Sequence, residues 1–168
     1  MEERLARFRA VPLGSLAADP VWTSARHLAD AASAWIAALA DADARRRAQG
    51  SVDRLVRSEW TPALTHGDFA PANVLLRADG SLVLLDLGSV AERHPLLDRA
   101  WWALIVRYHH GPASLALPRL AGLALPDVAV ARALQLHAHA RPSTRQHALE
   151  LTMAALSWAE EQPPPRPR

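Results

Sequence analysis

The residues of this chain that could perform chemistry gather within residues 64–88, in the stretch LTHGDFAPANVLLRADGSLVLLDLG. His66, Asp68, Asn73 and Asp86 stand there, in a chain of which half the residues are apolar. Amide and carboxylate oxygens suit a hard cation such as Mg²⁺, which usually shares its coordination shell with phosphate groups. A carboxylate in an exposed loop can also accept a proton from an incoming hydroxyl group.

Two short runs of β-type sequence position these side chains. Residues 74–77 and 82–87 flank the turn-forming residues 78–81 and predict an antiparallel hairpin. If this turn sets the register, Asn73 faces Asp86, and directly opposed residues lie on one side of the ribbon, about 5 Å apart. The hairpin therefore predicts a shared metal site at its open end.

A solvent-facing hairpin whose Asp and Asn residues merely suit turns is the alternative. It accounts for Asp79-Gly80, but it does not account for Asp86, which ends an otherwise apolar strand.

Three ordered segments carry a family resemblance. His66-Gly67-Asp68-Phe69-Ala70-Pro71-Ala72-Asn73 resembles the catalytic loop of the aminoglycoside phosphotransferase family, a branch of the protein-kinase-like fold. Asp86-Leu87-Gly88 resembles its metal-binding Asp-x-Gly element, and His94-Pro95-Leu96-Leu97-Asp98 resembles the next element. Together they are more specific than any one alone. The resemblance covers about residues 20–160 and matches the C-terminal lobe of that fold.

The resemblance implies a role for each site residue. Asp68 would orient the acceptor hydroxyl and take its proton, and His66 would complete the catalytic loop by bracing it. Asn73 and Asp86 would hold Mg²⁺ on the phosphates of ATP, with Gly88 in the same cofactor-binding element.

Asp98, which follows, is expected to cap a helix and tie the loop in place. Contact with the substrate is its alternative role.

Helical periodicity surrounds the hairpin. It predicts helices over about residues 21–48, 52–59, 95–109, 127–140 and 143–160, with Asp19-Pro20 as a start signal and Gly50 as a stop. The expected fold is therefore α+β and mainly helical: the C-terminal lobe of a protein-kinase-like fold, with a short hairpin carrying the metal ligands.

This reading gives three segments. Residues 1–19 form a lead-in, and residues 20–161 form the lobe, with the catalytic loop at 66–73 and the Asp-x-Gly element at 86–88. Residues 162–168 form a disordered Pro/Arg tail, for which docking into an aromatic groove is the alternative.

Composition excludes several classes of protein. Cysteine is absent, which removes disulfide scaffolds and Cys-based metal sites. All nineteen basic residues are arginine, scattered between acids at a net charge of +2, so nucleic acid is not an expected partner. No signal peptide and no run near the roughly 20 apolar residues of a membrane span is present. We expect a soluble, cytoplasmic, bacterial protein.

The resembled kinases also carry an N-terminal lobe with a phosphate-covering loop and a lysine. The residues before His66 suggest helices, without a Gly-rich loop, and the chain has no lysine. The prediction is therefore an ATP-dependent phosphotransferase acting on a small-molecule hydroxyl, truncated here and weakly active or inactive alone, with an N-lobe from another chain as one way to complete it. A non-catalytic remnant or pseudokinase-type binding module is the alternative.

The acceptor is expected to be neutral or anionic. A polycationic aminoglycoside needs a pocket rich in carboxylates. After Asp98 the chain has only four acids: Asp127, Glu150, Glu160 and Glu161.

Other notable side chains are expected to be structural. The pairs His109-His110 and His137-x-His139 could suggest metal binding, but close neighbours on a helix diverge. Trp101, Trp102 and Trp158 are expected to anchor the core.

Overall fold

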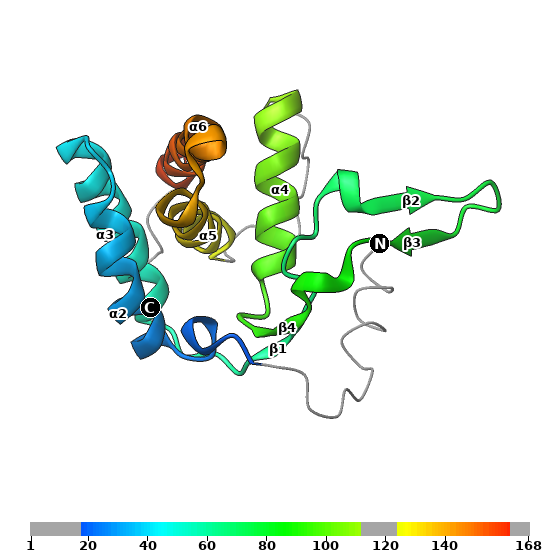
Figure 1. Ribbon diagram of the computed structural model, residues 1–168. Coiled ribbons are helices and arrows are strands. Elements are labelled where there is room, and N and C mark those ends of the chain that lie inside the picture. The colour runs from blue at the N-terminus through cyan, green and yellow to red at the C-terminus, as the bar shows by residue number, and fades with distance from the viewer. Residues whose placement is uncertain (1–17, 112–123, 162–168) are drawn as a thin grey trace.

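The computed structural model describes residues 18–111 and 124–161, which form a mainly helical α+β unit with two small antiparallel sheets (Figure 1). The predicted fold class is confirmed at this level. The predicted tail, and nearly all of the predicted lead-in, lie outside the described residues. Among the described helices, none is long and apolar enough to cross a membrane. The longer helices are α2 (Ala25–Ala37), α3 (Ala42–Val56), α4 (Leu97–His110), α5 (Leu125–His139) and α6 (Pro142–Glu160).

Helix α5 forms the centre of the core. It packs against α2, α3, α4 and α6, and Figure 1 shows α5 and α6 between the α2–α3 pair and α4. Val128, Val130 and Leu134 have no exposed surface, and the alanines between them are equally buried. A helix that is apolar around most of its circumference belongs inside a protein, and small alanine side chains let its neighbours approach closely.

The prediction of one helix over residues 21–48 is wrong. The chain forms a short 3-10 helix, η1 (Pro20–Trp22), and then the separate helices α2 and α3. The oxygen of Ser24 accepts a hydrogen bond from the N–H of His27, and that of Asp41 accepts one from the N–H of Ala44. These two N-caps satisfy backbone donors that a continuous helix would have used internally.

Two further predictions near this break need correction. Gly50 lies inside α3 and does not stop a helix, and the helix predicted over residues 52–59 is the last part of α3. Asp19-Pro20 does begin a helical turn, because Asp19 caps η1.

The three C-terminal helices begin and end within two residues of their predicted bounds.

The predicted hairpin is present with shorter strands and a different register. Strands β2 (Val74–Leu76) and β3 (Leu82–Leu84) pair so that Val74 faces Leu84 and Leu76 faces Leu82. The N–H of Leu85 donates to the carbonyl of Asn73 at 2.9 Å, so Asn73 faces Leu85 and not Asp86. The predicted register is therefore wrong by one residue.

The turn explains this shift. Arg77 belongs to the turn, because its N–H donates to the Ser81 carbonyl and its own carbonyl accepts from the N–H of Gly80. Gly80 has a left-handed φ of 76°, and Asp79 accepts a hydrogen bond from the N–H of Ser81. Residues 77–81 thus form an odd-numbered loop, and the strands slide by one position.

A second sheet was not expected from the sequence. Strand β1 (Ala63–Thr65) pairs antiparallel with β4 (Ala91–Arg93). This pairing places the residues just before His66 beside the residues just before His94. The candidate catalytic loop and the segment that leads into α4 therefore start next to each other.

Candidate active site

The carboxylate of Asp98 holds the start of the predicted catalytic loop. Asp98 lies in the first turn of α4 with no exposed surface, and it accepts hydrogen bonds from the N–H groups of His66 at 2.8 Å and Gly67 at 3.0 Å. Hydrogen bonds to an ionised acceptor are the strong ones. The predicted loop-tying role is confirmed. Capping of the helix is not, since Leu96 takes the N-cap position.

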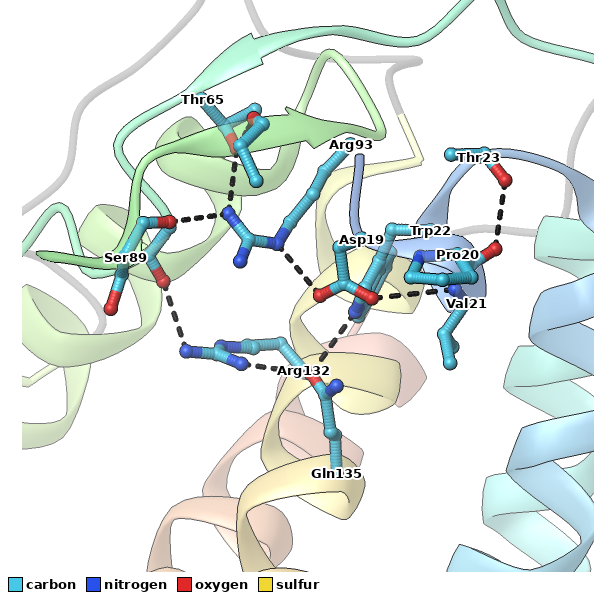
Figure 2. A network of polar contacts seen from close by, with 12 residues as sticks. Asp19, Pro20, Val21, Trp22, Thr23, Thr65, Ser89, Arg93, Arg132 and Gln135 are labelled. Carbon is cyan, nitrogen blue, oxygen red and sulfur yellow. Dashed lines mark hydrogen bonds and ion pairs between the residues drawn. The ribbon is translucent and has the colours of Figure 1, made fainter. Parts of the chain in front are cut away.

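Gly67 is required by its surroundings. Its φ is 81°, and a Cβ atom there would lie 2.5 Å from Nη1 of Arg93 and from the carbonyl oxygen of Ser89. Arg93 occupies this space because it binds three segments: it donates to the Ser89 carbonyl at 2.6 Å, to Asp19 at 2.9 Å and to Thr65 at 3.3 Å (Figure 2). The end of strand β1 just before the candidate catalytic loop, the segment after Asp-x-Gly and the N-cap of η1 are joined through one guanidinium group.

The carboxylate of Asp68 is held from two sides. Asn73, in the 3-10 helix η2 (Pro71–Asn73), donates its amide N–H groups to Oδ2 of Asp68 at 2.9 Å and to its backbone carbonyl at 2.8 Å. The indole Nε1–H of Trp101 on α4 donates to Oδ1 at 3.1 Å. Asp68 is half-buried, and each carboxylate oxygen keeps lone-pair capacity for a further donor.

His66 has a bracing contact. Its ring is fully buried, and Nε2–H donates to the carbonyl oxygen of Leu85 at 2.8 Å. A carbonyl can only accept, so this partner assigns the proton to Nε2. The bond links the catalytic loop to the residue immediately before Asp86.

Asp86 leaves the hairpin in an unusual conformation. Its φ of 52° and ψ of 67° are left-handed, and it is the only non-glycine residue with positive φ in the described part of the chain. It precedes the 3-10 helix η3 (Leu87–Ser89) and is exposed. A Cβ atom on Gly88 would lie 3.4 Å from Oδ1 of Asp86, so the carboxylate turns back toward Gly88.

The two predicted metal ligands share no hydrogen bond. Within residues 18–111 and 124–161, no hydrogen bond is made to Oδ1 of Asn73 or to the carboxylate of Asp86. Since the amide nitrogen of Asn73 is committed to Asp68, its amide oxygen remains for another partner. In the described chain no group of three or more His, Cys, Asp or Glu residues could hold a metal ion.

Arg132 of α5 is a site residue that the sequence did not reveal. It donates to the carbonyl of Gly67 at 2.9 Å and to Gln135 at 2.8 Å, and its guanidinium lies 5.9 Å from the centre of the Trp101 ring. Figure 2 shows it close to Arg93. Burial, and then the charge of Arg93, lower the pKa of Arg132, while Asp68 and other nearby acids oppose this. The group remains a cation.

Of the remaining candidates, the tryptophans lie in or against the core, as predicted. Trp101 and Trp158 are buried in the core, and Trp102 is half-buried with its ring 5.0 Å from that of Phe69. His109 and His110 are exposed neighbours with ring centres 6.5 Å apart.

A comparison with protein-family models gives one match. The model described as "Phosphotransferase enzyme family" matches residues 3–134, which is most of the chain and includes the catalytic loop, the Asp-x-Gly element and α4. No curated protein and no solved structure matches the chain.

Proposed function

The chain belongs to the phosphotransferase enzyme family, and from this membership we propose that its site transfers the γ-phosphate of ATP to a hydroxyl group of a small molecule. The observation that carries the proposal is the Asp68 carboxylate, held by Asn73 and Trp101 beside a backbone loop that Asp98 ties down. Preorganised groups of this kind lower a barrier because they need no rearrangement during reaction.

Asp68 is the proposed general base. It accepts the proton of the acceptor hydroxyl as that oxygen forms its bond to the γ-phosphorus. The bond from the γ-phosphorus to the bridging oxygen breaks, and ADP leaves with that electron pair. Asn73 holds the carboxylate of Asp68 through a hydrogen bond, and Asp98 holds the backbone of the loop. His66 braces the loop through its hydrogen bond to the hairpin.

Asn73 and Asp86 are the proposed ligands of Mg²⁺. Each offers an oxygen to which the described chain makes no hydrogen bond, and oxygen ligands of this kind, few in number, suit an ion that is also bound by nucleotide phosphates. When bound, Mg²⁺ offsets negative charge on the phosphates.

The β2–β3 hairpin is the proposed contact with an N-terminal lobe. Leucines in the hairpin and just after it are exposed: Leu75 is 50% exposed, Leu76 66%, Leu85 41% and Leu87 54%. Figure 1 shows the hairpin extending away from the helices. Because a lone two-stranded hairpin is at best marginally stable in water, these residues support the proposal that the folded unit is the C-terminal lobe of a kinase-like fold, with an N-lobe from another chain packed over them.

The acceptor is proposed to be neutral or anionic. All four carboxylates that follow Asp98 in the sequence have partners: Asp127 binds Arg54, Glu150 accepts from Tyr108, Glu160 binds Arg47, and Glu161 binds Arg107. None of them is left to receive the ammonium groups of a polycation.

Paramagnetic NMR tests the metal site directly. Asn73 is the only asparagine of the chain, so selective ¹⁵N-asparagine labelling gives a single side-chain amide signal. Adding Mn²⁺ with ATP in excess of the protein should broaden this signal. Asp86→Ala should abolish the broadening, and Asp79→Ala, a change at another exposed acid of the hairpin, should leave it intact. Equal broadening in Asp86→Ala would contradict the assignment.

Turnover tests the reaction itself. In any preparation that releases ADP in the presence of hydroxyl compounds, Asp68→Asn should keep nucleotide binding and lose most turnover. Metal binding without phosphotransfer in every preparation tested would favour a binding module.

A further inference from the structure

We propose that Trp101 is a positioning residue, whose indole N–H fixes the orientation of the Asp68 carboxylate. The inference rests on the proposed function, because the orientation of Asp68 matters chemically only if Asp68 receives a proton from the acceptor. The inference extends the proposed function, because it assigns Trp101 a role in addition to packing in the core.

Packing accounts for the ring of Trp101 but not for its polar atom. The side chain is only 5% exposed and belongs to the central apolar cluster, where a phenyl ring would fill most of the same space. A buried indole N–H needs an acceptor, and here the acceptor is Oδ1 of Asp68 at 3.1 Å. The hydrogen bond therefore joins the rigid core to the half-buried loop.

Two donors on two oxygens define the plane of the carboxylate. The terminal torsion of an aspartate is broad, so a carboxylate held through one oxygen can still rotate. Asn73 holds Oδ2 from the loop itself, and Trp101 holds Oδ1 from α4. With both in place, the remaining lone pairs of Asp68 point in fixed directions.

The ring of Trp101 is held in turn by Arg132. The guanidinium of Arg132 lies 5.9 Å from the ring centre, and the same group donates to the carbonyl of Gly67, the residue before Asp68. Cations favour the face of an indole. Helix α5 thus supports both the backbone and, through Trp101, the carboxylate of the base.

The indole signal of Trp101 tests the hydrogen bond without any need for turnover. In the full chain labelled with ¹⁵N-tryptophan, the Trp101 signal is identified as the one lost in Trp101→Phe. We expect the Trp101 indole N–H, as a buried donor to a carboxylate, to exchange slowly with water, and Asp68→Ala, which removes the acceptor, to move its signal and speed its exchange. Asp79→Ala, at an exposed acid of the hairpin turn, is the control and should change neither. An unchanged indole signal and exchange rate in Asp68→Ala would overturn the proposal.

The amide signal of Asn73 tests the positioning role. Trp101→Phe should let the Asp68 carboxylate rotate, so the Asn73 side-chain protons should exchange faster with water. Trp102→Phe is the matched control, because its indole makes no hydrogen bond to Asp68, and it should leave this exchange unchanged. Unchanged exchange in Trp101→Phe, or equal acceleration in both variants, would overturn the proposal.

These results are independent of the reaction. The comparison of the Trp101 indole signal between the wild type and Asp68→Ala remains decisive even if Trp101→Phe folds poorly, because the Trp101 signal can also be assigned from contacts to its neighbours. If both NMR results hold and Asp68→Asn keeps full turnover in an active preparation, the proposed function fails while the contact stands.

Discussion

At the scale of the residue, the left-handed backbone of Asp86 bears on its proposed role as a metal ligand. Its left-handed backbone costs an ordinary residue about 1–2 kcal/mol, and Asp and Asn tolerate it better than most. A strained residue at the end of an apolar strand is typical of a site where function sets the conformation.

Substitutions at Asp86 should therefore separate stability from metal binding. Asp86→Gly should be as stable as the wild type, or more stable by up to about 1 kcal/mol, because glycine adopts this φ without strain. Asp86→Ala should lose about 1 kcal/mol, and Asp86→Asn should change little. Urea unfolding measures all three, and the Mn²⁺ effect on Asn73 should be lost in the glycine and alanine variants, which add no second asparagine. An alanine variant more stable than the glycine variant would refute the strain argument.

His94 couples the fold to pH. It is 4% exposed, and burial lowers its pKa from 6.5 to about 4. Its Nδ1 accepts the N–H of Leu96 at 3.1 Å, and its ring lies 4.6 Å from that of Trp60. All of these contacts suit the neutral ring.

Stability should fall as the pH falls from about 6.5 to about 4. In this window the unfolded chain binds a proton at His94 that the folded chain does not, so protonation favours unfolding, by about 3 kcal/mol in total. Urea unfolding at several pH values measures the slope. His94→Asn should flatten the slope in this window, whereas His110→Gln, at an exposed histidine, should not. If the free energy of unfolding of His94→Asn fell with pH as steeply as that of the wild type, groups other than His94 would cause the loss of stability.

At the scale of the element, the sequence predicted the helices whose apolar residues recur with helical spacing and the segments that carry a motif. Helices α4, α5 and α6 show this spacing, so their predicted bounds lie close to the observed ones. The break between α2 and α3 falls in residues 38–41, Ala-Leu-Ala-Asp, none of which forbids a helix. Strands β1 and β4 are three residues long and lie far apart in sequence, so their pairing leaves no local signal.

The contacts within the candidate loop and its tie to Asp98 were predictable, whereas its other supports were not. The motif named Asp68 and Asn73, which are in contact, and His66, which reaches the hairpin. The sequence did not reveal Arg93, Trp101 and Arg132 as site residues, because the strand or apolar helix in which each one lies already explains its presence. Only tertiary contacts direct their polar atoms to the loop.

Gly67 of the candidate catalytic loop and Gly80 of the hairpin turn are a matched pair of positions for alanine variants. Gly67 and Gly80 have φ values of 81° and 76°, so an alanine strains the backbone similarly at both. Only at Gly67 does the new Cβ clash, at 2.5 Å, with Arg93 and the Ser89 carbonyl, since nothing lies within 4 Å of a Cβ at Gly80.

Gly80→Ala should therefore cost about 1 kcal/mol, and Gly67→Ala clearly more, roughly 2–4 kcal/mol. Thermal and urea unfolding of both variants measure the difference. Gly67→Ala should also disturb the Asn73 amide signal, while Gly80→Ala should not. Equal losses of stability would mean that Arg93 moves away at little cost.

At the scale of the whole molecule, the distribution of charge limits the acceptor. The chain has a net charge of +2, and the cations Arg93 and Arg132 lie close to the candidate base. We expect no tight binding of kanamycin-like polycations. Calorimetry at low and moderate salt measures this binding, and a salt-sensitive dissociation constant in the micromolar range or below would refute the prediction.

The last prediction concerns nucleotide binding by the 168-residue chain alone. Its described residues supply the proposed base and two proposed oxygen ligands, and the chain has no lysine with which to bind phosphates as the kinase-like fold does. A Mg²⁺ ion held by one or two protein oxygens gives little affinity by itself. Within residues 18–111 and 124–161, the exposed leucines of the hairpin face no second wall against which to bury an adenine ring. We therefore expect a dissociation constant for Mg-ATP in the millimolar range or weaker, which corresponds to roughly 4 kcal/mol or less, and no turnover above background. Titration of the Asn73 amide signal with Mg-ATP measures the affinity, and Asp86→Ala controls for binding elsewhere. Micromolar binding that Asp86→Ala abolishes would mean that this chain builds a complete nucleotide site from its own residues.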